Sequence, residues 1–350
     1  MTSTAERTDK DVLRLWLEAH LAAGGVPWAL ITGAQGLQPL GLKAGSPGAL
    51  ITGIDRRRSD ESSSYASDVV SVRLATGEEL RFFLKDFAAS QFPKESLQRQ
   101  RDRELHVYRD LLARAGLGAP AYHGSVWDDA QGRFWLLLEF VDGMPVDYCA
   151  FDYWVQAAAW LGRLHGAFAR QADRLRACDF LVRHDADFFR SRARLALEGV
   201  SRCWPALAGR LADVVRRYET CVGVMVSQPP TLVHGSYDSR NILIDARSEP
   251  VRVSPVDWEM AAVGSALYDL AYLAYGFKPP SLDRLLDAYR DEARAQGVAL
   301  PDRERMRQVL DCFRLHRLLK RLSGAPQRAA PEAKIAQRIG EAERLIAAAC

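Results

Sequence analysis

The pattern of hydrophobic and polar positions predicts a helix and then five β-strands in the first 140 residues. Apolar residues recur at helical spacing from about residue 8 to a Gly-Gly pair at 24–25. Apolar or alternating runs predict strands at 49–56, 68–74, 80–87, 121–127 and 134–141. A short glycine-containing segment, 75–78, predicts a hairpin turn, and a charged helix is expected at 94–115.

The rest of the chain has mainly helical periodicity. Helices are expected up to about residue 223, short strands at 231–245 and 251–257, and helices again from about residue 268. A strand-rich part followed by a larger helical part predicts a two-lobed α+β fold. We expect an N-terminal helical extension at 1–48, a first lobe at 49–142 and a second lobe at 143–350.

Composition narrows the class of protein. The chain has 350 residues, 48% of them hydrophobic, and its 47 basic and 44 acidic residues leave a net charge of +3. This excludes a disordered chain and argues against a nucleic-acid-binding protein, which needs a strong basic excess. No apolar run approaches the ~18 residues that span a bilayer, no secretory signal is recognisable, and the six cysteines lack patterned spacing. We therefore expect a cytoplasmic protein that binds neither nucleic acid nor membranes.

Four polar residues occur in an order that suits phosphoryl transfer. Lys85 lies near the end of the third predicted strand, Glu104 lies on the next helix, and Asn241 and Asp257 follow far downstream near strand ends. A lysine supplies a compact cation for nucleotide phosphates and needs a carboxylate to hold it, while an amide oxygen and a carboxylate suit Mg²⁺. Each residue alone is weak evidence, but the ordered set is specific.

Five segments extend this set into a family pattern. They are 138–143 (LEFVDG), 161–165 (LGRLH), 234–241 (HGSYDSRN), 257–259 (DWE) and 264–271 (GSALYDLA). With these motifs the chain resembles the aminoglycoside-phosphotransferase-like kinases, which include choline, homoserine and antibiotic kinases and are related to protein kinases. The resemblance implies a protein-kinase-like fold with a five-stranded antiparallel sheet plus helix in the N-terminal lobe and a larger, mainly helical C-terminal lobe.

The resemblance also implies ATP as a cofactor, bound by the first lobe. Lys85 would contact the nucleotide phosphates and Glu104 would orient Lys85. Backbone groups at Glu139, Phe140 and Val141 would recognise adenine. Residues 49–142 would then form a nucleotide-binding lobe.

Two further sets of residues follow from the resemblance. Asn241 and Asp257 would ligate Mg²⁺, in a second lobe that also carries the catalytic loop and the substrate-binding helices. The loop that would cover the phosphates, 58–65, contains no glycine, but Ser62 and Ser63 offer hydroxyls and backbone amides to phosphate oxygens. A solvated polar turn fits this loop equally well.

The catalytic loop departs from the family at its centre. The family has Asp two residues after His234, but this chain has Ser236, and a hydroxyl lacks the basicity of a carboxylate. If the segment is extended, Asp238 lies on the same side about 6.5 Å away and could substitute as the base. The alternative is that Asp238 caps the turn before Asn241. A serine nucleophile is disfavoured because the Gly-x-Ser-x-Gly turn is absent.

The acceptor is the least determined part. Between residues 301 and 340 there are ten Lys and Arg against four Asp and Glu, which disfavours polycationic acceptors, although a solvated helix face explains the bias too. We predict an ATP-dependent phosphotransferase that acts on a hydroxyl of a small molecule or peptide. The alternative is a nucleotide-binding pseudokinase with a regulatory or scaffolding role. The sequence leaves the oligomeric state open.

Overall fold

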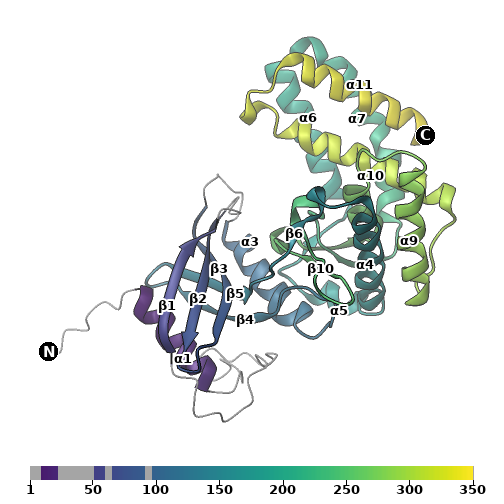
Figure 1. Ribbon diagram of the computed structural model, residues 1–350. Helices are drawn as coiled ribbons and strands as arrows, with labels where there is room; N and C mark the ends of the chain where they lie inside the picture. Colours follow the sequence, from purple (N-terminus) through teal and green to yellow (C-terminus); the bar gives the residue numbers. More distant parts are fainter. Residues whose placement is uncertain (1–8, 23–50, 60–64, 91–96, 350) are drawn as a thin grey trace. The chain divides into compact units, whose positions relative to one another are not determined.

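The computed structural model describes residues 9–22, 51–59, 65–90 and 97–349 (Figure 1). The chain divides into two compact units, Met1–Gly143 and Met144–Cys350. None of the helices in the described ranges is long and apolar enough to cross a membrane.

The first unit contains a five-stranded antiparallel sheet with the strand order β1-β2-β3-β5-β4. Its strands are β1 (Ile51–Arg58), β2 (Tyr65–Leu74), β3 (Glu79–Ser90), β4 (Tyr122–Asp128) and β5 (Arg133–Glu139). The predicted hairpin between β2 and β3 is confirmed. Gly77 has a φ of +85° and donates its N–H to the Leu74 carbonyl at 3.0 Å, a conformation that favours glycine.

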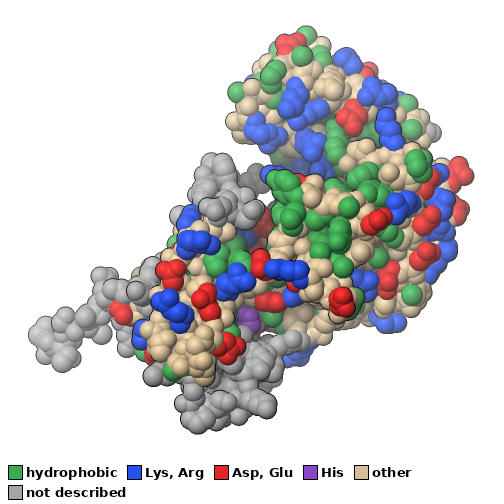
Figure 2. Space-filling view, in the orientation of Figure 1, with side chains coloured by type: hydrophobic (Ala, Val, Ile, Leu, Met, Phe, Trp, Pro, Cys, Tyr) green, Lys and Arg blue, Asp and Glu red, His purple; other side chains and the backbone are tan. Residues whose placement is uncertain are grey.

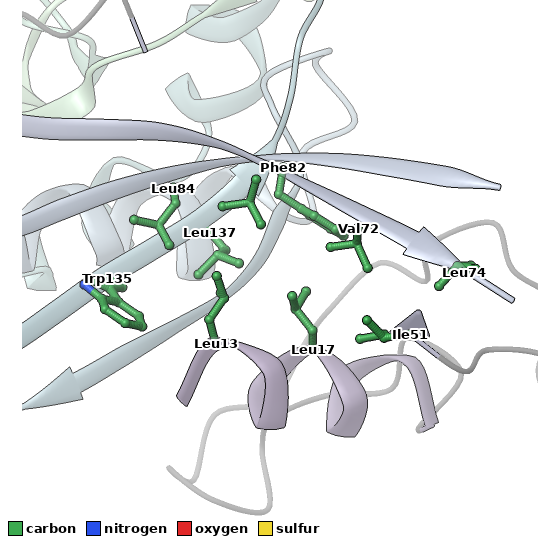
Figure 3. Packing of buried hydrophobic residues seen from close by; sticks show 10 residues of the cluster. Leu13, Leu17, Ile51, Val72, Leu74, Phe82, Leu84, Trp135 and Leu137 are labelled. Carbon is green, nitrogen blue, oxygen red and sulfur yellow. The ribbon is translucent and has the colours of Figure 1, made fainter. Parts of the chain in front are cut away.

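Helix α1 (Asp9–Ala22) packs on this sheet (Figure 3). Leu13 and Leu17, one turn apart on one helix face, are 2% and 0% exposed and point toward the sheet side chains Val72 and Leu84. Burial of a leucine stabilises a fold by roughly 1.5–3 kcal/mol. The described part of α1 therefore belongs to the core of the first unit.

One further helical segment of this unit carries a predicted site residue. Helix α3 (Leu97–His106) continues directly as a π-helical turn, η1 (Val107–Leu112). The α3 residues Glu104 and Leu105 are buried, as are Val107 and Tyr108 of η1. The apolar positions fix the orientation of α3, and this orientation places Glu104 on the buried side.

The second unit is mainly helical. Its helices are α4 (Phe151–Ala169), α5 (Ala172–Ala177), α6 (Ala186–Cys203), α7 (Pro205–Val226), α8 (Leu267–Leu273), α9 (Ser281–Ala295), α10 (Arg303–Ser323) and α11 (Glu332–Ala349). Short 3₁₀ turns are η2 (Val146–Tyr148), η3 (Ser239–Asn241), η4 (Trp258–Met260) and η5 (Pro326–Arg328). Helix α4 packs along α9, while α6, α7, α10 and α11 pack on one another at one end of this unit (Figure 1).

Two small sheets position the loops of the second unit. One has the order β10-β9-β6 and the other β7-β11-β8. Their strands are β6 (Met144–Pro145), β7 (Val182–Arg183), β8 (Pro230–Val233), β9 (Ile242–Asp245), β10 (Arg252–Pro255) and β11 (Ala262–Ser265). The expectation of one strand at 231–245 is wrong, because β8 and β9 belong to different sheets and a loop separates them. The α+β class with a five-stranded antiparallel sheet is confirmed.

Candidate active site

A buried ion pair in the first unit joins strand β3 to helix α3. Lys85 Nζ lies 2.7 Å from Glu104 Oε2, and the two side chains are 9% and 1% exposed. The rings of Tyr65 and Phe87 lie 5.3 and 5.4 Å from the ammonium group, within cation–π distance. The structure thus brings together the two residues that the sequence singled out, and it holds a compact cation in one orientation.

The segment after β5 contains the three predicted adenine-binding positions. Glu139 donates its N–H to the Ala121 carbonyl at 2.8 Å, and its Oε2 accepts the Ala121 N–H at 3.0 Å, so this N–H is engaged within the fold. The Phe140 ring packs under the Arg81 guanidinium at 4.5 Å. The backbone groups of Phe140 and Val141 make no hydrogen bond with another described residue and are free to contact a base edge.

The two serines of the expected phosphate-covering loop cannot be placed. Ser62 and Ser63 lie outside the described residues. Of the predicted nucleotide-binding positions, the described part of this unit therefore places Lys85 and the segment after β5.

Buried Asp269 fixes the start of the catalytic loop in the second unit. Its two carboxylate oxygens accept the N–H groups of His234 at 2.6 Å and of Gly235 at 3.0 Å. Gly235 has a φ of +79°, and a Cβ there would lie 2.0 Å from the Met260 carbonyl oxygen. The turn therefore requires glycine, and it packs directly on the segment that follows Asp257. Through these contacts, Asp269 of the 264–271 motif braces the loop that begins at His234.

His234 is fully buried, and both of its ring nitrogens contact backbone groups. Nε2 lies 3.0 Å from the Val256 carbonyl, which can only accept, so Nε2 carries the proton. Nδ1 then accepts the Ser236 N–H at 3.3 Å. Burial lowers the pKa of His234 below its usual value, which keeps the ring neutral. The ring links two segments of the loop and has no nitrogen left for a substrate.

Ser236 occupies the position of the family's catalytic Asp. Its half-buried hydroxyl makes no hydrogen bond with a described residue, and its carbonyl accepts the Asp238 N–H at 2.7 Å. This bond closes a tight turn around Tyr237, whose hydroxyl donates to the Ala157 carbonyl at 3.1 Å. The expectation of an extended segment with residues 236 and 238 about 6.5 Å apart on one side is therefore wrong, because the chain turns at Tyr237.

Asp238 is held by an arginine from a distant helix. Although Asp238 precedes η3, its side chain makes no capping hydrogen bond, so the capping interpretation is wrong. Its Oδ1 instead pairs with Arg317 of α10, and the two side chains are 35% and 8% exposed. Arg317 also donates to the Tyr272 carbonyl at 2.9 Å. Sequence reasoning missed Arg317 as a residue at the catalytic loop, and its only signal was the basic bias of residues 301–340.

The two predicted metal ligands are linked through the backbone. Val256 donates its N–H to the Asn241 carbonyl at 2.9 Å, which places the next residue, Asp257, beside Asn241. Asn241 Nδ2 donates to the Ser236 carbonyl at 2.9 Å and leaves its amide oxygen without a hydrogen bond to any described residue. An amide oxygen and a carboxylate are hard oxygen donors of the kind that Mg²⁺ prefers, so the donor set fits this ion.

The fold and these two residue sets define the class of protein. A five-stranded antiparallel sheet with a strand Lys paired to a helix Glu, followed by a helical unit with a His-Gly loop and an Asn–Asp pair, is the protein-kinase-like plan. The model of the phosphotransferase enzyme family (APH) matches residues 62–309, more than two thirds of the chain. The chain belongs to this family, and it is a phosphotransferase with an alcohol group as acceptor.

Solved structures with the same fold have low sequence identity. The microcompartment-associated aminopropanol kinase is 15% identical, with a TM-score of 0.52 over 85% of this chain and 91% of that one. A macrolide 2'-phosphotransferase from Brachybacterium faecium is 16% identical, with a TM-score of 0.52 over 84% and 92%. The GDP complex of aminoglycoside 2'-phosphotransferase-IIIa is 15% identical, with a TM-score of 0.56 over 85% and 93%. No curated protein matches the chain significantly.

Proposed function

We propose that the protein is a kinase that transfers the γ-phosphoryl group of ATP to a hydroxyl of a small molecule. The observation that carries the proposal is the buried Lys85–Glu104 pair, at 2.7 Å. Burial of two charges costs several kcal/mol per ion before pairing, so such a pair is a poor device for stability alone. It becomes useful when the ammonium group binds phosphate. The names of the structural relatives, an aminopropanol kinase and two 2'-phosphotransferases, support a small hydroxyl acceptor.

The nucleotide is assigned to residues of the first unit. Lys85 binds phosphate oxygens as a point charge, and Glu104 prevents it from swinging away. The free backbone groups of Phe140 and Val141 bind the edge of the base, whereas Glu139 serves the sheet through its bonds to Ala121. In this proposal residues 49–142 form the nucleotide-binding lobe and residues 143–350 carry the catalytic loop, the metal ligands and the acceptor site.

The metal is assigned to Asn241 and Asp257. Mg²⁺ held by these oxygens supplies positive charge that offsets the negative charge of the transferred group. Gly235, His234 and Asp269 keep the two ligands in place, since together they fix the loop before Asn241 and its packing on Met260. His234 is thus a positioning residue.

Asp238 is proposed to take the proton of the acceptor. Its Oδ1 is bound by Arg317, while Oδ2 makes no hydrogen bond with a described residue. As the acceptor oxygen forms its bond to the γ-phosphorus, the bond to the bridging oxygen breaks, ADP leaves with that electron pair, and Oδ2 accepts the hydroxyl proton. Ser236 leaves space but contributes no base. General-base assistance of this kind is worth about 10²–10⁴-fold in rate.

Nucleotide binding is tested by thermal unfolding with MgATP. We expect a clear rise in the unfolding temperature, since ligand at 100 times its Kd stabilises a protein by about 2.7 kcal/mol. Lys85→Met should lose most of the rise. Lys278→Met removes an exposed lysine and should leave the rise in unfolding temperature unchanged. No rise for the unmodified protein would overturn the proposal.

The role of Asp238 is tested by the rate of ADP formation in a screen of small hydroxyl compounds. Asp238→Asn should lower the rate by about 10²–10⁴-fold and keep the MgATP-induced stabilisation. Asp238→Asn also leaves Arg317 without its carboxylate, so a loss of activity alone could come from that change. The double variant Ser236→Asp/Asp238→Asn therefore provides a second measurement. It should regain activity, because it restores a carboxylate at the family's own base position. MgATP stabilisation without ADP formation for any acceptor would instead favour the regulatory nucleotide-binding alternative.

A further inference from the structure

A group of cationic side chains lies at the end of α10, on η5 and on α11, and we call it the α10–α11 cation cluster. Figure 2 shows Lys and Arg side chains gathered over this end of the second unit. The cluster consists of Arg321 of α10, Arg328 of η5 and Arg338 of α11. Among the described residues, no carboxylate lies within ion-pair distance of any of the three.

Three other arginines of α10 have carboxylate partners, whereas the exposed Arg305, like the cluster, has none among the described residues. Arg303 pairs with Asp287 and Arg307 with Asp283 of helix α9, and Arg314 lies 3.0 Å from Asp311. The helix dipole favours cations in the last turn of α10, which explains Arg321. It does not explain why Arg328 and Arg338 converge on the same place from outside that helix.

Contacts within the cluster hold like charges together. Arg328 donates to the Arg321 carbonyl at 2.8 Å, and its guanidinium lies over Gly324, where a Cβ would be 2.6 Å from it. Burial lowers the pKa of Arg338 below its usual value, and the charges of Arg321 and Arg328 lower it further. Tyr275 and Glu341 act in the opposite direction without reversing the shift. An anion bound here would relieve this repulsion.

The cluster is connected to the catalytic loop by direct contacts. The Tyr275 ring lies 4.5 Å from the Arg317 guanidinium and 4.8 Å from that of Arg321. Arg317 in turn pairs with Asp238, two residues after Ser236. One tyrosine ring therefore separates the arginine that holds the catalytic loop from the first unpaired cation.

We propose that the α10–α11 cation cluster binds an anionic group, a phosphate or carboxylate, of the hydroxyl acceptor. This inference rests on the proposed phosphotransferase function and names the class of its acceptor: a small hydroxyl compound that carries a negative charge at its far end. Arginine forks bind carboxylate and phosphate in a bidentate manner, which orients as well as attracts. Polycationic acceptors such as aminoglycosides would be repelled from this site.

Inorganic phosphate is the probe for the cluster alone. Its binding is measured by the shift in unfolding temperature of the Lys85→Met variant, in which the nucleotide site does not contribute. We expect phosphate to raise the unfolding temperature, and Arg321→Gln/Arg338→Gln to weaken this binding at least about tenfold. The control Arg305→Gln/Arg344→Gln removes the same charge from exposed positions on the same two helices and should behave like the parent. An equal phosphate response in both double variants, or no response in the parent, overturns the cluster as an anion site.

The acceptor role is tested with three-carbon diols that differ only in charge: glycerol 3-phosphate, glycerol and 3-amino-1,2-propanediol. The expected order of kcat/KM for ADP formation places the anionic compound first, with KM raised at least about tenfold in Arg321→Gln/Arg338→Gln while kcat changes little. A preference for the neutral or cationic diol overturns the inference and leaves the kinase function intact. If MgATP does not stabilise the protein but phosphate still binds to the cluster, the phosphotransferase proposal and the acceptor role are both overturned.

Discussion

At the scale of single residues, the loop that begins at His234 owes its shape to buried side chains that hold its backbone. Asp269 binds two backbone N–H groups, and His234 spans from Val256 to Ser236. Each of these side chains is buried, and each of their hydrogen bonds satisfies a backbone group that would otherwise be buried without a partner. The loop is therefore determined by the core beneath it, which explains how its shape tolerates Ser at position 236.

Gly235 is the residue at which this dependence is sharpest. We expect Gly235→Ala to displace Met260, because a Cβ would lie 2.0 Å from the Met260 carbonyl oxygen. Asp257, which precedes Met260 by three residues, should move with it. The Mg²⁺-dependent part of the ATP-induced rise in unfolding temperature should then disappear. This part is measured as the difference between samples with Mg²⁺ and with EDTA.

Gly276→Ala is the matched control for this prediction. Gly276 has a similar positive φ, +89°, but a Cβ there would meet nothing within 4 Å. Both substitutions carry the same cost of a left-handed alanine, roughly 1–2 kcal/mol, and only Gly235→Ala adds the collision. An unchanged Mg²⁺ response in Gly235→Ala would show that the turn and the metal ligands are independent.

Sequence reasoning succeeded for site residues where motifs are local and failed where partners are remote. Lys85 and Glu104 are 19 residues apart on a strand and the next helix, and they form the expected contact. Asp238 and Arg317 are 79 residues apart, and no local pattern connects them. The alternation rule also placed residues 236 and 238 on one side, because a turn held by one backbone hydrogen bond leaves no signature in hydrophobicity.

At the scale of elements, the contact between α4 and α9 depends on two glycines that lie one turn apart on α4. A Cβ on Gly162 would lie 2.8 Å from the Tyr289 carbonyl oxygen and 2.9 Å from the Ala293 nitrogen. A Cβ on Gly166 would lie 2.2 Å from Gln296 Cβ. The absence of side chains on this face lets the two helices approach closely.

Gly162→Ala is therefore expected to destabilise the second unit by roughly 1–3 kcal/mol, the usual range for overpacking, since backbone atoms cannot move aside as a side chain can. Gly209→Ala on α7 is the matched control, because a Cβ there meets nothing within 4 Å. It should raise stability by up to about 1 kcal/mol through the better helix propensity of alanine. Urea unfolding of both variants checks the prediction, and equal effects of the two substitutions would contradict it.

Elements with strong periodicity were predictable, whereas those defined by distant pairing were not. The hairpin at Gly77 and the five strands of the first unit followed from alternation and turn residues. Strands β7 and β11 are only two and four residues long and pair with each other across 78 residues of intervening chain. Such strands exist because the fold brings their backbones together, so a local window contains no evidence of them.

At the scale of the whole molecule, three buried imidazoles in the second unit are kept neutral by the core around them. Burial lowers the pKa of His184 to about 3 and that of His316 well below its usual value, and Lys320 lowers both further. His184 stacks on Phe188 at 4.4 Å, and His316 accepts or donates a hydrogen bond at 2.9 Å to Tyr218. With His234, these residues make the folded state resist protonation.

Stability should consequently fall as the pH falls below about 6.5, the pKa of an unperturbed histidine. In the range between that value and the lowered pKa values, the unfolded chain binds protons that the folded chain excludes. His184 then removes about 1.4 kcal/mol of stability between pH 7.5 and 5.5, and the lowered pKa values of His316 and His234 act in the same direction. Urea unfolding followed by circular dichroism at the two pH values measures this loss, and His184→Phe, which keeps the aromatic packing, should reduce it by about 1.4 kcal/mol. A profile that is flat over this range, or one that His184→Phe leaves unchanged, would contradict the prediction.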